Sequence, residues 1–239
     1  NTQGALINQT DPLNAGTERV YDGNFRPTSI TDATGATTSL TWSADGSNLT
    51  RVIDAGGGQT DITYDALNNP TSIVDALNYL TTYGYNGKLL TSVTNALNEV
   101  TSYTYTPDGL LGSVTDPLGN TASYTYDSHG QRTSMTDSLG NTWTYSYDPQ
   151  GLGRLVDTTD PSGRVVHSEY DAAGRLTRQT QNYDAPKSQN QDQVWNIVTE
   201  YAYDARGNQI SVTDTFGRVT QYEYDNADRL VKTIDPAGN

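Results

Sequence analysis

Polar and apolar residues alternate along short segments of this chain. In residues 120–126, Ala122, Tyr124 and Tyr126 alternate with Thr and Ser. A period of two is typical of a β-strand with two different faces, and both Thr and Tyr favour strands. A second kind of segment, such as residues 130–137, keeps no steady phase, which we interpret as strands with bulges or strands packed on both faces. Helix periodicity and helix-start signals are absent, so the pattern predicts an all-β fold.

The alternating segments belong to a sequence repeat. A phrase with paired aromatic residues, as in SYTYDSHG and EYAYDARG, recurs along the whole chain, and we take its last aromatic residue as an anchor. Successive anchors are 21, 22, 21, 20, 21, 21, 23, 33 and 21 residues apart, and the long interval holds an insertion near residues 181–196. We therefore expect residues 1–239 to be a single array of about ten units. The anchors are Tyr21, Trp42, Tyr64, Tyr85, Tyr105, Tyr126, Tyr147, Tyr170, Tyr203 and Tyr224.

Two turn signals divide each unit. The first follows the anchor and has Gly at the fourth position in most units; Asn68 and Asp228 replace it in two units, and Phe25 and Leu89 depart from it. The second has Asp or Asn followed three residues later by Gly or Asn, residues that tolerate positive φ. Such turns predict type I-based hairpin loops that end in a left-handed residue. The second turns begin at Asp11, Asp32, Asp54, Asp75, Asn95, Asp116, Asp137, Asp160, Asp214 and Asp235.

The predicted fold is an antiparallel meander of about twenty short strands. At about 4.8 Å between strands it would form a ribbon of about 95 Å by 20 Å. Such a long, twisted sheet is expected to curl into a spiral or partial shell. The repeated tyrosines, such as Tyr103 with Tyr105 and Tyr145 with Tyr147, would then meet across neighbouring hairpins, stack in rows between adjacent repeats and form most of the core.

Composition narrows the classes of function. Hydrophobic residues make up 33% of the chain, Cys is absent, and 28 acidic residues outnumber 14 basic ones for a net charge of −14. We expect no nucleic-acid partner and no membrane insertion, because there is neither a basic field nor an apolar run long enough for a membrane helix. The absence of Cys excludes disulfides and thiolate chemistry. Because residue 1 is Asn and no secretory signal follows it, we expect a processed or excised piece.

No candidate chemistry stands out from the repeat. The Asp residues recur at equivalent turn positions, which indicates a structural role, whereas an active site needs one special unit. His129 and His167 lie in different units without a nearby nucleophile motif, and we expect His129 to be a surface residue. Calcium-loop patterns are missing, and the glycine run 56–58 has no following Lys or helix. The sequence therefore predicts no catalytic, cofactor-binding or metal-binding residue and no enzyme.

The insertion at 181–196 is the one stretch that breaks the pattern. It is rich in Gln, Asn and Asp and carries Tyr183 and Trp195, whose rings could stack on a sugar or a partner surface. The simpler interpretation is an elaborated loop in which Trp195 begins the next strand.

The repeat unit resembles the RHS or YD repeat. Residues 170–176 (YDAAGRL), 126–130 (YDSHG) and 203–207 (YDARG) match its phrase, and the likeness extends from about Asp11 to the end of the chain. RHS repeats are found in bacterial Rhs polymorphic toxins, in the C component of Tc toxin complexes, in wall-associated surface proteins and in animal teneurins. The resemblance implies a sheet that spirals into a hollow shell, in many members around a C-terminal toxic domain. Because no shell-closing core, self-cleavage site or toxin domain is recognisable, we expect a segment of a shell wall.

These features lead to a non-catalytic structural role. The expected partners are further repeats and a cargo or toxin domain of the parent chain, in an exported protein that is secreted or on the cell surface. The absence of disulfides favours a bacterial source. The alternative is a carbohydrate-binding or adhesion module of a bacterial surface protein. In either case, unpaired end strands would favour edge-to-edge self-association.

Overall fold

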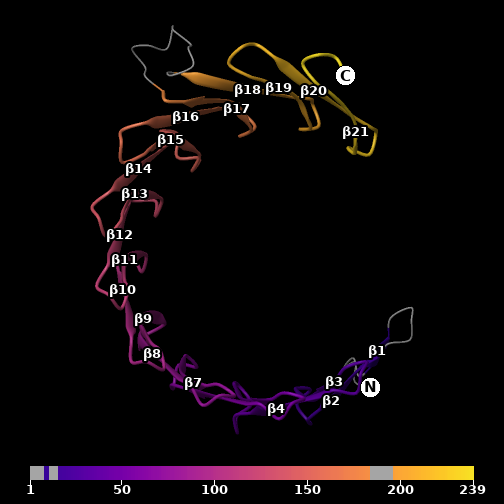
Figure 1. The fold of residues 1–239 in the computed structure, drawn as a ribbon, viewed down its shortest axis with the longest axis vertical. Coiled ribbons are helices and arrows are strands. Elements are labelled where there is room, and N and C mark those ends of the chain that lie inside the picture. The colour runs from indigo at the N-terminus through magenta and orange to yellow at the C-terminus, as the bar shows by residue number, and fades with distance from the viewer. Residues whose placement is uncertain (1–7, 11–15, 184–195) are drawn as a thin grey trace. The chain divides into compact units, whose positions relative to one another are not determined.

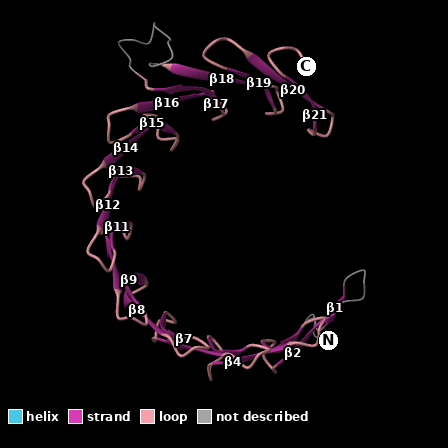
Figure 2. Cartoon of the chain, viewed as in Figure 1, coloured by secondary structure: helices cyan, strands magenta, loops and turns pink. Residues whose placement is uncertain are grey.

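The computed structural model of the protein describes residues 8–10, 16–183 and 196–239. These residues form 21 strands and no helix (Figure 2), so none of them belongs to a helix that could cross a membrane. The strands are β1 Asn8–Thr10, β2 Gly16–Tyr21, β3 Pro27–Thr31, β4 Thr37–Trp42, β5 Leu49–Ile53, β6 Gln59–Tyr64, β7 Pro70–Val74, β8 Leu80–Asn86, β9 Leu89–Thr94, β10 Val100–Tyr105, β11 Leu111–Thr115, β12 Thr121–Tyr126, β13 Arg132–Thr136, β14 Thr142–Tyr147, β15 Leu155–Thr159, β16 Val165–Tyr170, β17 Leu176–Gln181, β18 Ile197–Tyr203, β19 Gln209–Thr213, β20 Val219–Tyr224 and β21 Leu230–Ile234.

The strands form an antiparallel meander. The chain divides into two compact units, Asn1–Thr121 and Ala122–Asn239. The first holds β1–β11 and the second holds nearly all of β12–β21, and within each unit a strand pairs with its neighbours in sequence. Each unit, taken alone, is a narrow sheet that bends along its length (Figure 1). The predicted all-β meander of curling hairpins is confirmed.

The two faces of the sheet differ as the alternation predicts. In β12 the hydroxyl-bearing residues Thr121, Ser123 and Thr125 are exposed, whereas Tyr124 and Tyr126 are half-buried. Among the described residues, Val198 is the one apolar side chain that is fully buried. The described residues of each unit therefore form a single layer of sheet, in which large side chains pack along one face.

A β-bulge explains why the second kind of segment keeps no steady phase. Pairing between β12 and β13 shifts register at the anchor, so that Thr125 is opposite Ser134 but Tyr126 is opposite Arg132. The same shift occurs at the other anchors in strand pairs such as β4–β5 and β16–β17. Each sequence repeat thus carries one extra residue opposite its anchor. This residue moves the following strand out of simple alternation.

The turns have the geometry that their sequence predicts. In residues 116–120, the amide of Gly119 donates to the carbonyl of Asp116 at 3.0 Å, and the amide of Asp116 donates to the carbonyl of Asn120 at 2.9 Å. Gly119 has φ +87°, which is the left-handed residue of a type I turn with a bulge. The turn beginning at Asp11 lies outside the described residues.

The uneven repeat interval arises in the first turns. Most anchors pair with the residue six positions later, but Trp42 pairs with Leu49 and Tyr147 with Leu155, where the intervals are 22 and 23 residues. Tyr85 pairs with Leu90, and its interval is 20 residues. The loops absorb the length differences, so that the strands keep their register.

The two departures at the first turn have different outcomes. The hairpin after Tyr85 is a two-residue loop with Gly87 at φ +61°, so Leu89 is already in a strand. Phe25, by contrast, occupies the left-handed position itself, with φ +64°. A bulky residue in this region is unusual and carries conformational strain.

Candidate functional site

Consecutive turns of a meander lie at opposite edges of its sheet, so each unit has two edges with different turns. We call the edge that holds the turns after the anchors the first-turn edge, and the opposite edge the second-turn edge. The first-turn edge carries the turns at residues 22–26, 43–48, 65–69, 86–89, 106–110, 127–131, 148–154, 171–175, 204–208 and 225–229. The second-turn edge carries the turns at 32–36, 54–58, 75–79, 95–99, 116–120, 137–141, 160–164, 214–218 and 235–239.

Anchor residues connect successive repeats at the first-turn edge. The hydroxyl of Tyr170 donates to the carbonyl of Leu155, 15 residues earlier, at 2.8 Å. The indole of Trp42 makes the same contact with the carbonyl of Pro27 at 2.8 Å. The side chain therefore satisfies a backbone acceptor at the start of a strand in the preceding repeat. The other recorded bonds of this kind join Tyr64 to Leu49, Tyr105 to Leu90, Tyr147 to Arg132, Tyr203 to Leu176 and Tyr224 to Gln209.

These bonds take the place of the expected ring stacking. Within the two units, the part of the chain that the structure describes contains one stacked aromatic pair, His167 with Tyr183, with ring centroids 4.4 Å apart. Anchors lie on alternate strands, about 10 Å apart at ordinary strand spacing, whereas stacked rings need centroids within about 7 Å. The expectation of stacked tyrosine rows is wrong, and the phenol oxygen links the repeats instead.

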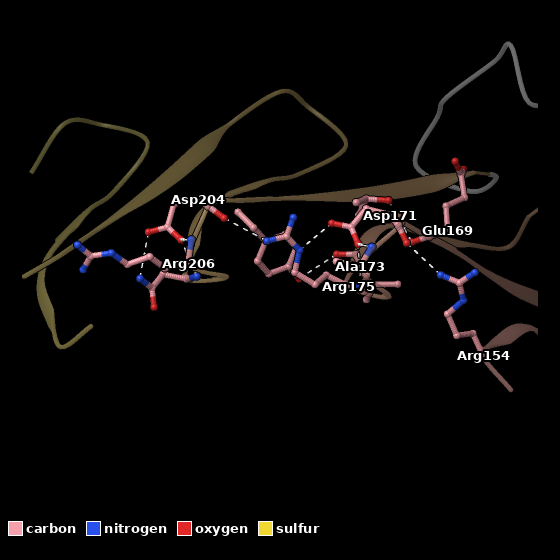
Figure 3. A network of polar contacts seen from close by, with 11 residues as sticks. Arg154, Glu169, Asp171, Ala173, Arg175, Asp204 and Arg206 are labelled. Atoms are coloured by element: carbon pink, nitrogen blue, oxygen red, sulfur yellow. Dashed lines mark hydrogen bonds and ion pairs between the residues drawn. The ribbon is translucent and has the colours of Figure 1, made fainter. Parts of the chain in front are cut away.

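Arginines near the ends of the first turns connect repeats in the C-terminal unit (Figure 3). The guanidinium of Arg175 donates to Asp171 in its own turn at 2.7 Å and to the backbone carbonyl of Asp204 in the next turn at 3.1 Å. Arg154 likewise bonds the Asp148 carboxylate at 2.7 Å and the Asp171 carbonyl at 3.0 Å. Each arginine therefore closes one turn and holds the next.

Shorter polar side chains do the same work in the N-terminal unit. The amide of Asn69 donates to the Asp65 carboxylate and to the Gly87 carbonyl, both at 2.8 Å, and Asn69 is almost fully buried. Asn48 donates to the Asn68 side chain at 2.7 Å, and the Lys88 ammonium bonds the Leu67 carbonyl. Different residue types thus link neighbouring turns along this edge.

Aromatic anchors also contact the linking cations. The guanidinium of Arg175 lies over the ring of Tyr203 at 4.9 Å, and that of Arg154 lies over Tyr170 at 5.6 Å. Outside the anchors, the guanidinium of Arg132 lies over the ring of Tyr145 at 4.8 Å. Because a cation over an aromatic face is attracted by the ring quadrupole, anchor and arginine stabilise each other.

Most of the aspartates that open the turns are held as carboxylates. The Asn120 side chain, followed by backbone amides, lowers the pKa of Asp116 below its ordinary value of 3.8, and the Gln131 amide does the same for Asp127. In the turn that Ser43 opens, Asp45 lies at the centre, and the Ser43 hydroxyl and the amide and hydroxyl of Ser47 lower the pKa of Asp45 to about 2. Hydrogen bonds to the charged form explain these shifts. Their recurrence in both kinds of turn identifies the carboxylates as structural groups.

One polar cluster lies outside this repeating scheme. Asp157 accepts a hydrogen bond from Ser146 at 2.9 Å and contacts the His167 ring nitrogen at 2.6 Å. Asp157 is paired with Ser146 on one neighbouring strand and with His167 on the other. A hydrolase triad needs the imidazole between hydroxyl and carboxylate, whereas here the carboxylate lies between the other two groups. The cluster is therefore not arranged to activate Ser146.

The remaining candidate residues fall in three places. His129 is exposed at the tip of a first turn, in agreement with a surface role. Tyr183 is half-buried with one face stacked on His167, so that face is covered, and Trp195 lies outside the described residues. Within the described ranges, no group of three or more His, Cys, Asp or Glu side chains is placed to hold a metal ion.

Sequence reasoning found the anchors and turns but missed the linking side chains. Arg154, Arg175 and Asn69 each follow directly after the left-handed residue that ends a first turn. The signal was a polar side chain with hydrogen-bond donors at this position, and its changing identity concealed the shared role. The Ser146–Asp157–His167 cluster could have been found from the strand register across the turns at 148–154 and 160–164.

The chain belongs to the RHS repeat family. The model of the RHS Repeat matches residues 42–78, 85–121, 105–140, 126–152, 151–184 and 198–239. Together these matches cover well over half of the chain. The comparison with curated proteins gave no match.

Solved structures share the fold. The structure described as TcdB2-TccC3 without its hypervariable C-terminal region matches with a TM-score of 0.59 and 17% identity over 91% of this chain. The TcdB2-TccC3-Cdc42 structure matches with a TM-score of 0.59 and 16% identity over 98% of this chain. The chain spans only 15% and 16% of the lengths of those two chains. At such identities the likeness establishes the fold.

Proposed function

We propose that this chain is a non-catalytic segment of the wall of an RHS-repeat shell, which encloses a toxin or other cargo domain of the parent protein. The observation that carries the proposal is the linked first-turn edge. Side chains there bond neighbouring repeats again and again, as Tyr170, Arg175 and Asn69 do. Such links stabilise a single-layer sheet over many strands, which is what a thin wall requires.

The shape of each unit supports enclosure rather than an ordinary globular role. A globular domain buries its apolar face between two layers, but the described residues form one layer, with Val198 as the one fully buried apolar side chain. A bent single layer defines an inside and an outside. The structural matches to TcdB2-TccC3 chains, about six times longer than this one, support the view that the segment contributes a fraction of a larger wall.

The proposed setting is an exported bacterial toxin-type protein. It rests on the toxin-associated RHS proteins that the repeat resembles and on an acidic chain without Cys. The proposed mechanism is sequestration, in which the wall shields the cargo from solvent and proteases until its release. The net charge of −14 would favour a basic cargo.

Protease protection in the full-length parent protein tests this proposal. The cargo domain should resist digestion in the wild type and become sensitive when the wall is weakened by Tyr170→Ala together with Tyr203→Ala. A matched control replaces the exposed residue Leu152 with Ala, which should leave the cargo protected. If the cargo is digested equally fast in all three proteins, this segment does not enclose it.

A further inference from the structure

The second-turn edge of the N-terminal unit carries a row of exposed leucines. Leu77, Leu97 and Leu118 occupy the same position in three successive second turns, and their exposed fractions are 73%, 76% and 87%. We call these three residues the leucine row. Because successive turns on one edge are two strands apart, neighbouring leucines are spaced by about 10 Å. Tyr79, Leu80 and Val100, at the adjoining strand starts, are also exposed and widen the apolar surface.

Turn chemistry does not explain these leucines. The residue at this position contributes its backbone amide, which donates to the side chain that opens the turn, as Leu118 does to Asp116 at 2.9 Å. Thr34 and Ser162 make the same backbone contact in other second turns at 2.8 and 2.9 Å. A small polar side chain therefore suffices for the hairpin. Three large apolar side chains in succession, each more than two-thirds exposed, point to an apolar contact with another molecule or another part of the parent chain.

The chemistry of this edge restricts the partner. Between Arg51 and Arg132 the one Lys or Arg is Lys88, and it lies on the opposite edge, bonded to the Leu67 carbonyl. The leucine row thus has no cation with which to hold an acidic partner such as nucleic acid. The turn amides are already bonded within each turn, so the edge does not offer a row of free donors to an added strand.

The spacing of the row identifies the kind of surface that fits. A pitch of about 10 Å is that of alternate strands in a sheet, so another ribbon of the same repeat presents turns with the same pitch. Such a ribbon is abundant in long RHS chains, since the matched structures have chains of which this one covers 15–16%. We propose that the leucine row is a seam, at which this ribbon packs edge to edge against another stretch of RHS-repeat ribbon. This inference rests on the proposed function, because a shell wall wider than one ribbon needs such seams.

Self-association of the 239-residue chain tests the seam, because in this experiment a second copy supplies the other ribbon. Sedimentation velocity over a range of concentrations should show reversible association of the wild type. Higher salt should strengthen it, because two chains of net charge −14 repel each other. The triple variant Leu77→Ser, Leu97→Ser, Leu118→Ser should raise the apparent Kd by at least about tenfold, since it removes most of the apolar contact.

A matched control uses exposed leucines of the first-turn edge. Leu67→Ser with Leu152→Ser removes two leucines whose exposed fractions are 52% and 61% and should leave the association unchanged. Circular dichroism establishes that each variant keeps its sheet. A wild type that is monomeric at every concentration, or association that survives the triple substitution, would overturn the seam; the latter would indicate pairing of end strands.

Cysteine cross-linking provides a second test that does not require loss of an interaction. The chain contains no natural Cys, so Leu97→Cys and Leu67→Cys each introduce a single thiol. Under a mild oxidant, Leu97→Cys should form disulfide-linked dimers much faster than Leu67→Cys, and equal rates would contradict the seam. Both tests work without cargo, so a failed cargo-protection assay alongside positive results here would reject enclosure while leaving the seam intact.

Discussion

In each unit, the first-turn edge contains side chains that reach neighbouring repeats, whereas most turns of the second-turn edge are closed on themselves. Arg175 on the first-turn edge bonds the next turn, while its counterpart Arg218 on the second-turn edge bonds Asp214 in its own turn. Within the described residues, the second-turn edge has one comparable link, from the Thr215 hydroxyl to the Val198 carbonyl at 2.8 Å, beside the insertion.

The difference shows that one hairpin design can serve two purposes. Both edges use a carboxylate or amide oxygen to bind backbone amides and a left-handed residue to end the turn, so turn chemistry alone does not distinguish them. What differs is the side chain near the end of the turn. Polar donors on the first-turn edge stabilise the ribbon internally, and the leucine row on the second-turn edge leaves an apolar surface available for an outside contact.

The largest expected effect is on stability at low pH, where the turn aspartates that both edges share become protonated. Most of the aspartates that open turns have pKa values below the ordinary 3.8, as Asp116, Asp137 and Asp225 illustrate. A lowered folded-state pKa contributes stability that is fully present above the unfolded value and is lost as pH falls through the folded value. Stability should therefore be constant above about pH 5 and fall steeply from about pH 4 towards pH 2. Urea denaturation midpoints across this range measure it, and a midpoint that does not change with pH would contradict the carboxylate role.

The next largest effect concerns an anchor on the first-turn edge. Tyr170→Ala removes a half-buried ring and its hydrogen bond to Leu155, and should lower the free energy of unfolding by about 2–3 kcal/mol. Tyr170→Phe keeps the ring and should cost about 1 kcal/mol. Tyr79→Ala, at an exposed tyrosine of the second-turn edge, should change stability by less than about 0.5 kcal/mol. Equal losses for Tyr170→Ala and Tyr79→Ala in chemical denaturation would remove the distinction between the edges.

The structural features that recur in every repeat could be predicted from the sequence, whereas the side chains that link the repeats could not. The hairpins, the left-handed residues and the anchors recur at a fixed spacing, so that one unit supports the interpretation of the others. The links between repeats come from Arg154, Arg175 or Asn69 in different repeats. Because these residues differ in type, no recurring residue in the sequence marks their shared role. Ring stacking was the natural expectation for repeated tyrosines, but it failed because anchors on alternate strands are too far apart to stack.

Two arginines at equivalent turn positions allow the two edges to be compared through a smaller effect on stability. Arg175 and Arg218 each bond the aspartate four residues earlier, and each lies over an aromatic ring. Arg175, however, also bonds the Asp204 carbonyl in the next turn at 3.1 Å. Arg175→Ala should therefore cost about 1–2 kcal/mol. Arg218→Ala, whose ion pair is largely exposed, should cost no more than about 0.5 kcal/mol. Thermal or urea unfolding of the two variants measures the difference, and a larger loss for Arg218→Ala would reverse the assignment of the edges.

The smallest expected effect is a gain in stability on the first-turn edge. On the second-turn edge every described left-handed position holds Gly or Asn, whereas the first-turn edge tolerates Phe25 at φ +64°. Phe25 is exposed, so Phe25→Gly loses little packing and should stabilise the protein by up to about 1 kcal/mol through relief of left-handed strain. Gly119→Ala is the opposite change on the second-turn edge, where φ is +87° and no atom lies within 4 Å of the added Cβ. It should destabilise by about 1 kcal/mol through conformation alone. Denaturation curves that moved in the same direction for both variants would show that packing, not backbone conformation, decides stability at these turns.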